Sequence, residues 1–152
     1  MFQAVLLVCT GNICRSPMAE VLLAARRPGL RIASAGTHAP DDAPADPHAI
    51  ACMAARGLDL SNHRARRITA ELIAGFDLIL VAADHHRQTL IQRLPQTRGR
   101  IYRLGHWRDR EVADPIGGPR EAFEEAAREI ETCVHDWLPR IPDTTTRNHE
   151  AC

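Results

Sequence analysis

A cysteine and an arginine with five residues between them, Cys9 and Arg15, bound a short stretch near the start of the chain. A thiolate is a strong nucleophile, and a guanidinium together with a helix N-terminus stabilises the negative sulfur. We therefore expect the Cys9 thiol to be ionised near neutral pH. The planar guanidinium of Arg15 can donate two parallel hydrogen bonds to two oxygens of a phosphate. The pair predicts attack by sulfur on phosphorus.

The segments on either side of this stretch are predicted to hold it as a phosphate-binding loop. Residues 4–8 form a short apolar run with β-branched members, which favours a buried strand. Residues 17–25 favour a helix, with Pro17 in its first turn and Ser16 as its cap. Backbone N–H groups at the start of that helix would create an anion site. The alternative is a structural cysteine in a sharp turn, which leaves the spacing and the arginine unexplained.

Strands and helices are predicted to alternate along the rest of the chain. Further strands are expected at residues 30–34, 76–82 and 101–104, and further helices at 47–56, 69–75, 84–94 and 120–138. Asp46 and Thr69 are the predicted caps of the first two of these helices. This order predicts an α/β fold, a single-domain three-layer sandwich with a four-stranded parallel sheet flanked by helices. Cys9 would follow the carboxyl end of strand 1, where such sheets bind ligands. We expect a domain over residues 1–141 and a mobile tail over residues 142–152.

The overall composition narrows the class of protein. The 19 basic and 19 acidic side chains cancel, which gives no indication of a nucleic-acid partner or of binding to an anionic membrane. The apolar runs are too short for membrane insertion, and residues 1–3 leave no room for a signal peptide. Five cysteines, an odd number, favour a reducing cytoplasm. No spaced set of metal ligands is apparent, and the adjacent His85 and His86 are expected to be solvated.

The stretch Cys9 to Pro17, including Asn12 and Cys14, resembles the signature of the low-molecular-weight protein tyrosine phosphatases. Similar markers follow at residues 34–36, 63–66, 104–107 and 114–115, so the resemblance covers about residues 3 to 140. The chain is most similar to the bacterial branch that accompanies tyrosine kinases of exopolysaccharide and capsule export. The resemblance implies a sheet order of 2-1-3-4 and hydrolysis of protein phosphotyrosine through a cysteinyl-phosphate, without a cofactor. It also implies a cognate tyrosine kinase or export protein as substrate.

The resemblance further assigns roles to individual residues. Asp114 takes the position of the general acid, although an aspartate before Pro115 is by itself a common turn former. The phosphate-binding loop comprises Thr10, Gly11, Asn12, Ile13, Cys14 and Ser16, and it is supported by Ser34 and His63. From the sequence alone, a surface histidine in a basic loop is the favoured interpretation of His63. Cys14 is either a small buried thiol or the partner of Cys9 in a reversible disulfide.

The pocket walls depart from the family pattern. Many members carry an aromatic residue after the second strand and tyrosines after the Asp-Pro pair. This chain carries His38 and Ile116 in those loops. We expect Ile13, His38 and Ile116 to form the walls of the substrate pocket, with Trp107 as a further candidate. A pocket with so few aromatic residues is expected to bind small substrates weakly or broadly.

Three alternative functions stay open. A protein-arginine phosphatase of the same fold typically has threonine in place of Ile13. An arsenate reductase needs two further redox cysteines, which residues 82–100 lack. A catalytically silent phospho-binding module is disfavoured by the intact Cys9, Arg15 and Asp114.

Overall fold

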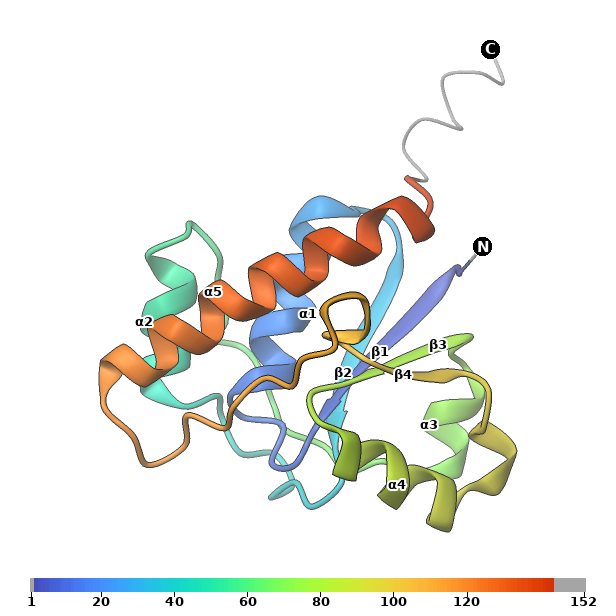
Figure 1. Ribbon diagram of the computed structural model, residues 1–152. Helices are drawn as coiled ribbons and strands as arrows, with labels where there is room; N and C mark the ends of the chain where they lie inside the picture. The colour runs from blue at the N-terminus through green and yellow to red at the C-terminus, as the bar shows by residue number, and fades with distance from the viewer. Residues whose placement is uncertain (1, 144–152) are drawn as a thin grey trace.

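Four strands and five α-helices alternate in the computed structural model, which describes residues 2–143 (Figure 1). The strands are β1 (Ala4–Cys9), β2 (Arg31–Gly36), β3 (Leu78–Val81) and β4 (Ile101–Arg103). The helices are α1 (Arg15–Arg26), α2 (Pro47–Ala54), α3 (Ala70–Ala74), α4 (Asp84–Arg93) and α5 (Arg120–Trp137), with single 3₁₀ turns at Pro95–Thr97, His106–Arg108 and Leu138–Arg140. Most of the predicted tail, residues 144–152, lies outside the described residues.

The strands form one parallel sheet in the order β2-β1-β3-β4, which confirms the predicted topology. Alternate residues of β1 enter two different cores. Val5 and Leu7 pack with α1, α2 and α5, whereas Leu6 and Val8 pack with residues of α3 and α4. Figure 1 shows these two groups of helices on opposite faces of the sheet. The three-layer sandwich therefore follows from strands that are apolar on both faces.

The local signals for helix starts are confirmed where the cap is a short polar side chain. The Asp46 carboxylate accepts a hydrogen bond from the His48 N–H at 2.9 Å, and the Thr69 hydroxyl accepts one from the Leu72 N–H at 3.1 Å. Among the helices built from residues 2–143, none is both long enough and apolar enough to cross a membrane.

Strand β2 extends two residues beyond the predicted strand and ends at Gly36. It pairs with β1 along its whole length, up to the Cys9–Gly36 pair, so the sheet reaches the start of the phosphate loop. A Cβ atom at Gly36 would lie 2.4 Å from the Thr10 carbonyl oxygen. Glycine is required here because the loop backbone packs directly on this strand.

Candidate active site

The sulfur of Cys9 lies at the carboxyl end of β1, inside the loop that leads to α1. The Asn12 N–H donates to this sulfur at 3.3 Å, and the Ser16 hydroxyl lies 2.9 Å from it. The Asn12 side-chain amide donates to the same hydroxyl oxygen at 2.9 Å, which leaves the Ser16 hydrogen free to be donated to sulfur. The Cys9 sulfur therefore faces two hydrogen-bond donors.

Ser16 does not cap α1, so that prediction is wrong. The helix begins at Arg15, its cap position is Cys14, and no side chain caps it. The helix starts early because the loop turns directly into it, which places Ser16 inside the first turn. Its hydroxyl is thereby directed at the sulfur of Cys9.

Arg15 is buried and connects the phosphate loop to the segment that carries Asp114. Its Nη1 donates to the Val112 carbonyl at 2.9 Å, and its Nη2 lies 3.6 Å from a carboxylate oxygen of Asp114. The Arg15 side chain is 5% exposed, whereas the Asp114 side chain is 44% exposed. The guanidinium is thus fixed at the base of the site, and the carboxylate stands at its edge within reach of solvent.

Asn12 organises the back of the loop from a left-handed backbone conformation with φ of 54°. Its side-chain amide donates to the Ser34 hydroxyl at 2.9 Å, and its side-chain oxygen accepts from the Arg66 N–H at 3.0 Å. His63 Nε2 lies 2.6 Å from the Asn12 carbonyl oxygen. Ser34 and His63 therefore both contact Asn12. Sequence reasoning missed the contact with Arg66, because a backbone N–H has no signature in the sequence.

Replacing Asn12 with alanine is expected to lower the free energy of unfolding by about 3 kcal/mol. The change removes three side-chain hydrogen bonds and places a less tolerant residue at positive φ. For Asn12→Gly the free energy of unfolding should fall by roughly 1 kcal/mol less than for Asn12→Ala, because glycine adopts the positive φ without strain. Urea unfolding of the two variants measures the difference. Equal losses would show that backbone strain contributes nothing at this position.

One hollow of about 310 Å³ brings the loop and the predicted walls together. It is lined by Cys9, Thr10, Gly11, Ile13, Cys14, Arg15, His38, Pro40, Asp114 and Ile116. Ile116 is 53% exposed at its edge. Pro40 is the one lining residue that the sequence analysis did not name. Trp107 lies elsewhere, against Trp137 and Arg140, so it does not form a wall of this pocket.

A model of the family described as low molecular weight phosphotyrosine protein phosphatase matches residues 4–148. The chain belongs to this family. The probable low molecular weight protein-tyrosine-phosphatase EpsP of Ralstonia nicotianae is 44% identical over 141 residues, which cover 93% of this chain and 97% of that protein. The chain is accordingly a protein-tyrosine-phosphatase of the low molecular weight type.

Two solved structures place this phosphatase among its structural relatives. Vibrio vulnificus Wzb, in complex with benzylphosphonate, matches with a TM-score of 0.90 and 34% identity, covering 93% of this chain and 100% of that one. The YwlE arginine phosphatase from Geobacillus stearothermophilus matches with a TM-score of 0.85 and 30% identity, covering 97% and 96%. The fold is thus shared with a protein named an arginine phosphatase, so the fold alone does not set which phosphorylated residue is cleaved.

Of the two adjacent histidines of this phosphatase, only His85 is exposed, so the prediction that both are solvated is wrong. His86 is 0% exposed. It lies in the first turn of α4, where the ring turns inward over the end of the sheet. Its Nδ1 lies 3.1 Å from the Ala83 nitrogen, and its Nε2 lies 2.8 Å from the Thr10 hydroxyl. The sequence gives no sign of this contact, because Thr10 and His86 are distant from each other in the chain.

Cys14 shares the pocket of this phosphatase with Cys9. Burial, followed by the nearby Asp46 carboxylate, raises the pKa of the Cys14 thiol to about 12. This thiol is therefore protonated at neutral pH. Cys52 and Cys133 are also buried free thiols, but neither lines the pocket of Cys9.

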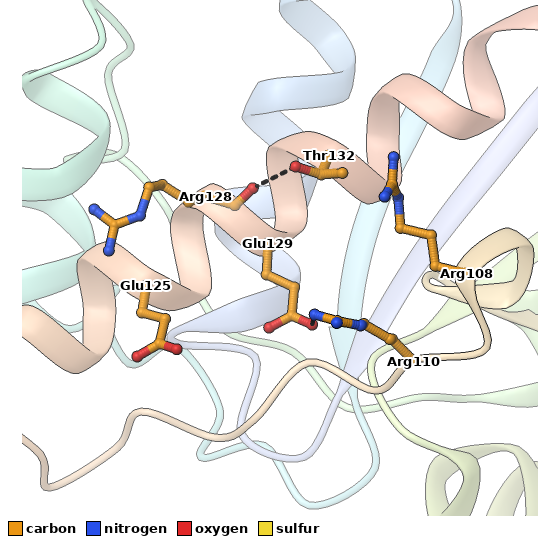
Figure 2. Close-up of a pocket in the computed structure, with 6 residues that line it drawn as sticks. All are labelled: Arg108, Arg110, Glu125, Arg128, Glu129 and Thr132. Atoms are coloured by element: carbon orange, nitrogen blue, oxygen red, sulfur yellow. Dashed lines mark hydrogen bonds and ion pairs between the residues drawn. The ribbon is translucent and has the colours of Figure 1, made fainter.

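A second hollow, of about 670 Å³, lies between α5 and the segment that follows β4 (Figure 2). Its lining residues are Arg108, Arg110, Glu125, Arg128, Glu129 and Thr132. Arg110 pairs with Glu129 at 3.8 Å, and no thiol is present among the lining residues. This hollow has charged walls but no thiol, whereas the smaller pocket contains Cys9 and Cys14.

Proposed function

We propose that this chain hydrolyses protein phosphotyrosine in two steps within the pocket of Cys9. In the first step the Cys9 sulfur attacks phosphorus and the ester P–O bond breaks. Asp114 gives its proton to the departing phenolate oxygen. Arg15 and the N–H groups of the loop hold the other phosphate oxygens while charge accumulates on them.

In the second step water completes the cycle. The Asp114 carboxylate takes a proton from a water molecule, which attacks phosphorus as the P–S bond breaks. Phosphate leaves, and Cys9 and Asp114 return to their starting protonation states. The observation that carries this proposal is the arrangement of one sulfur, one buried guanidinium and one exposed carboxylate around a single hollow.

The walls favour tyrosine over arginine as the phosphorylated residue. Ile13 and the exposed Ile116 offer an apolar surface to an aryl ring, whereas a guanidinium needs polar partners. Arsenate reduction is disfavoured because Cys14 is the only further thiol lining the pocket among residues 2–143. A silent phospho-binding module would not need the carboxylate of Asp114 beside the loop.

A comparison of substrates tests this proposal. We expect kcat/KM for a phosphotyrosine peptide to exceed that for the matching phosphoarginine peptide by at least about tenfold, the order that one apolar wall supplies. Ile13→Thr should narrow this ratio, and thiol-coupled reduction of arsenate should not be detectable. A wild-type enzyme that prefers phosphoarginine, or that cleaves neither peptide, would overturn the assignment.

The biological partner is proposed from the resemblance to the capsule-associated branch and from the likeness to EpsP and Wzb. The substrate would be a cognate bacterial tyrosine kinase or a protein of exopolysaccharide export. The phosphatase would act in the cytoplasm through a domain of residues 1–141, with residues 142–152 as a tail. No cofactor is required, because Arg15 and the loop supply the positive field.

Cys14 is proposed as a protective partner for Cys9. Peroxide would oxidise the Cys9 thiolate to a sulfenic acid, and the Cys14 thiol would condense with it to form a disulfide and water. Two equivalents of an external thiol would then return both cysteines to their reduced form. The shared pocket supports this role. The raised pKa of Cys14 acts against it, because the thiolate is the form that attacks a sulfenic acid and this thiol must first lose its proton.

A further inference from the structure

The hydrogen of the His86 ring can be assigned from its contacts. A backbone N–H can only donate, so the Ala83 N–H at 3.1 Å requires that Nδ1 of His86 carry no hydrogen. A neutral ring then carries its hydrogen on Nε2. That nitrogen lies 2.8 Å from the Thr10 hydroxyl oxygen and therefore donates to it. The direction of both bonds is thereby fixed, from Ala83 to His86 and from His86 to Thr10.

The environment of His86 keeps the ring neutral. The side chain is fully buried, and burial followed by the charge of Arg15 lowers the pKa of His86 to about 3. His85 and His38 also disfavour a positive charge there. The ring therefore keeps one hydrogen on Nε2 at every pH where a phosphatase would act, and the pattern of donors and acceptors does not change.

Thr10 is the residue through which this contact reaches the reacting groups. It follows Cys9 directly in the loop and lines the pocket. Its carbonyl oxygen accepts a hydrogen bond from the His38 N–H at 2.9 Å and lies against Gly36. The backbone of Thr10 is thus held on the side of β2, while its side chain is held by α4 on the other side of β1.

We propose that His86 is a positioning residue for phosphoryl transfer, which acts through Thr10 to hold the phosphate loop against the first turn of α4. This inference rests on the proposed function, because the loop must present its N–H groups to the transferring phosphoryl group. A small displacement of these N–H donors lowers the rate of phosphoryl transfer, because their stabilisation of the transition state depends on distance and angle. The strand and helix supply the rigid frame for the loop.

Two substitutions separate the two hydrogen bonds of His86. Asparagine places its side-chain oxygen near the position of Nδ1, so His86→Asn keeps the acceptor for Ala83 and loses the donor to Thr10. Glutamine places its nitrogen near Nε2, so His86→Gln keeps the donor to Thr10 and loses the acceptor. We expect His86→Asn to lower kcat for p-nitrophenyl phosphate by about tenfold with little change in KM. We expect His86→Gln to keep the greater part of kcat while lowering the melting temperature.

A purely structural role predicts the reverse relation, in which kcat follows stability and the less stable variant is the less active. Gln92→Ala serves as the control, because this α4 side chain is exposed, and the variant should leave both kcat and the melting temperature as in the wild type. Full kcat in His86→Asn, in a protein that remains folded, would overturn the proposal.

A double-mutant cycle with Thr10 identifies the route of the effect. Thr10→Val removes the acceptor for His86 and should reduce kcat about as much as His86→Asn, and the double variant should lose no more than either single variant. Thr10→Ser keeps a hydroxyl that can accept from His86 and should retain most of the wild-type kcat. Additive losses would overturn the proposed coupling, as would ¹⁵N NMR signals that place the His86 hydrogen on Nδ1. Absence of phosphatase activity in the wild type would instead contradict the proposed function itself.

Discussion

Replacing Cys9 with serine is expected to lower kcat on the order of 10⁶-fold while phosphate binding is retained. A serine hydroxyl is not ionised near neutral pH, so it cannot replace the sulfur anion as the nucleophile. The groups that hold phosphate remain, because Arg15 is anchored through Val112 and a serine oxygen can accept the hydrogen bond that the Asn12 N–H gives to the sulfur. The pocket should therefore bind an oxyanion that it can no longer attack.

Two measurements test this expectation together. Turnover of p-nitrophenyl phosphate reports the loss of the nucleophile, and calorimetric titration with inorganic phosphate reports the retained site. Cys52→Ser is a matched control, because this buried thiol lies outside the pocket. Its hydrogen bond to the Glu124 carboxylate can also be donated by a serine hydroxyl. If Cys9→Ser keeps more than about 1% of the wild-type kcat, the covalent route is contradicted, since removal of a nucleophile leaves far less.

Replacing Asp114 with asparagine is expected to slow hydrolysis of aryl phosphates by roughly 10² to 10⁴-fold. The amide is close in shape to the carboxylic acid, but it cannot protonate the leaving oxygen or deprotonate water. The hydrogen bond from the Ile116 N–H to Asp114 Oδ1, at 3.1 Å, can be kept by the amide oxygen, so the loop should hold its shape. The loss is therefore expected in kcat rather than in folding.

The choice of leaving group makes this second test specific. Phenyl phosphate leaves as a basic phenolate and should show a larger loss than p-nitrophenyl phosphate, whose leaving group needs less protonation. Glu111→Gln is the control, because it removes an exposed acid from the same loop but does not line the pocket. An Asp114→Asn enzyme with full activity on both esters would place the general acid at another residue.

The proposed chemistry depends on two chain segments that only the fold brings together. The phosphate loop is a single local unit, but Asp114 lies about a hundred residues later in the sequence. The two are joined by Arg15, which contacts the carbonyl of Val112 and the carboxylate of Asp114. One arginine can therefore hold substrate and also fix the distance between the loop and the acid. Changes at Val112 that move its carbonyl would be expected to affect both steps of the reaction.

The sequence by itself determined those features whose causes lie within a few residues of one another. The apolar run of β1, the short loop with Cys9 and Arg15, and the caps Asp46 and Thr69 were all predicted, because strand burial and helix capping depend on neighbouring side chains. The sheet order required the family resemblance as well, since alternation of strands and helices alone does not fix it.

The tertiary structure decided the features that depend on residues distant in the chain. Ser16 is aimed at sulfur rather than at the helix end because the loop turns directly into α1, and His86 is buried because α4 starts over Thr10, from which it is separated by 76 positions. Strand β2 reaches Gly36 only because β1 pairs with it to Cys9. Hydrogen-bond partners of this kind are set by packing, and no local pattern of residue types specifies them.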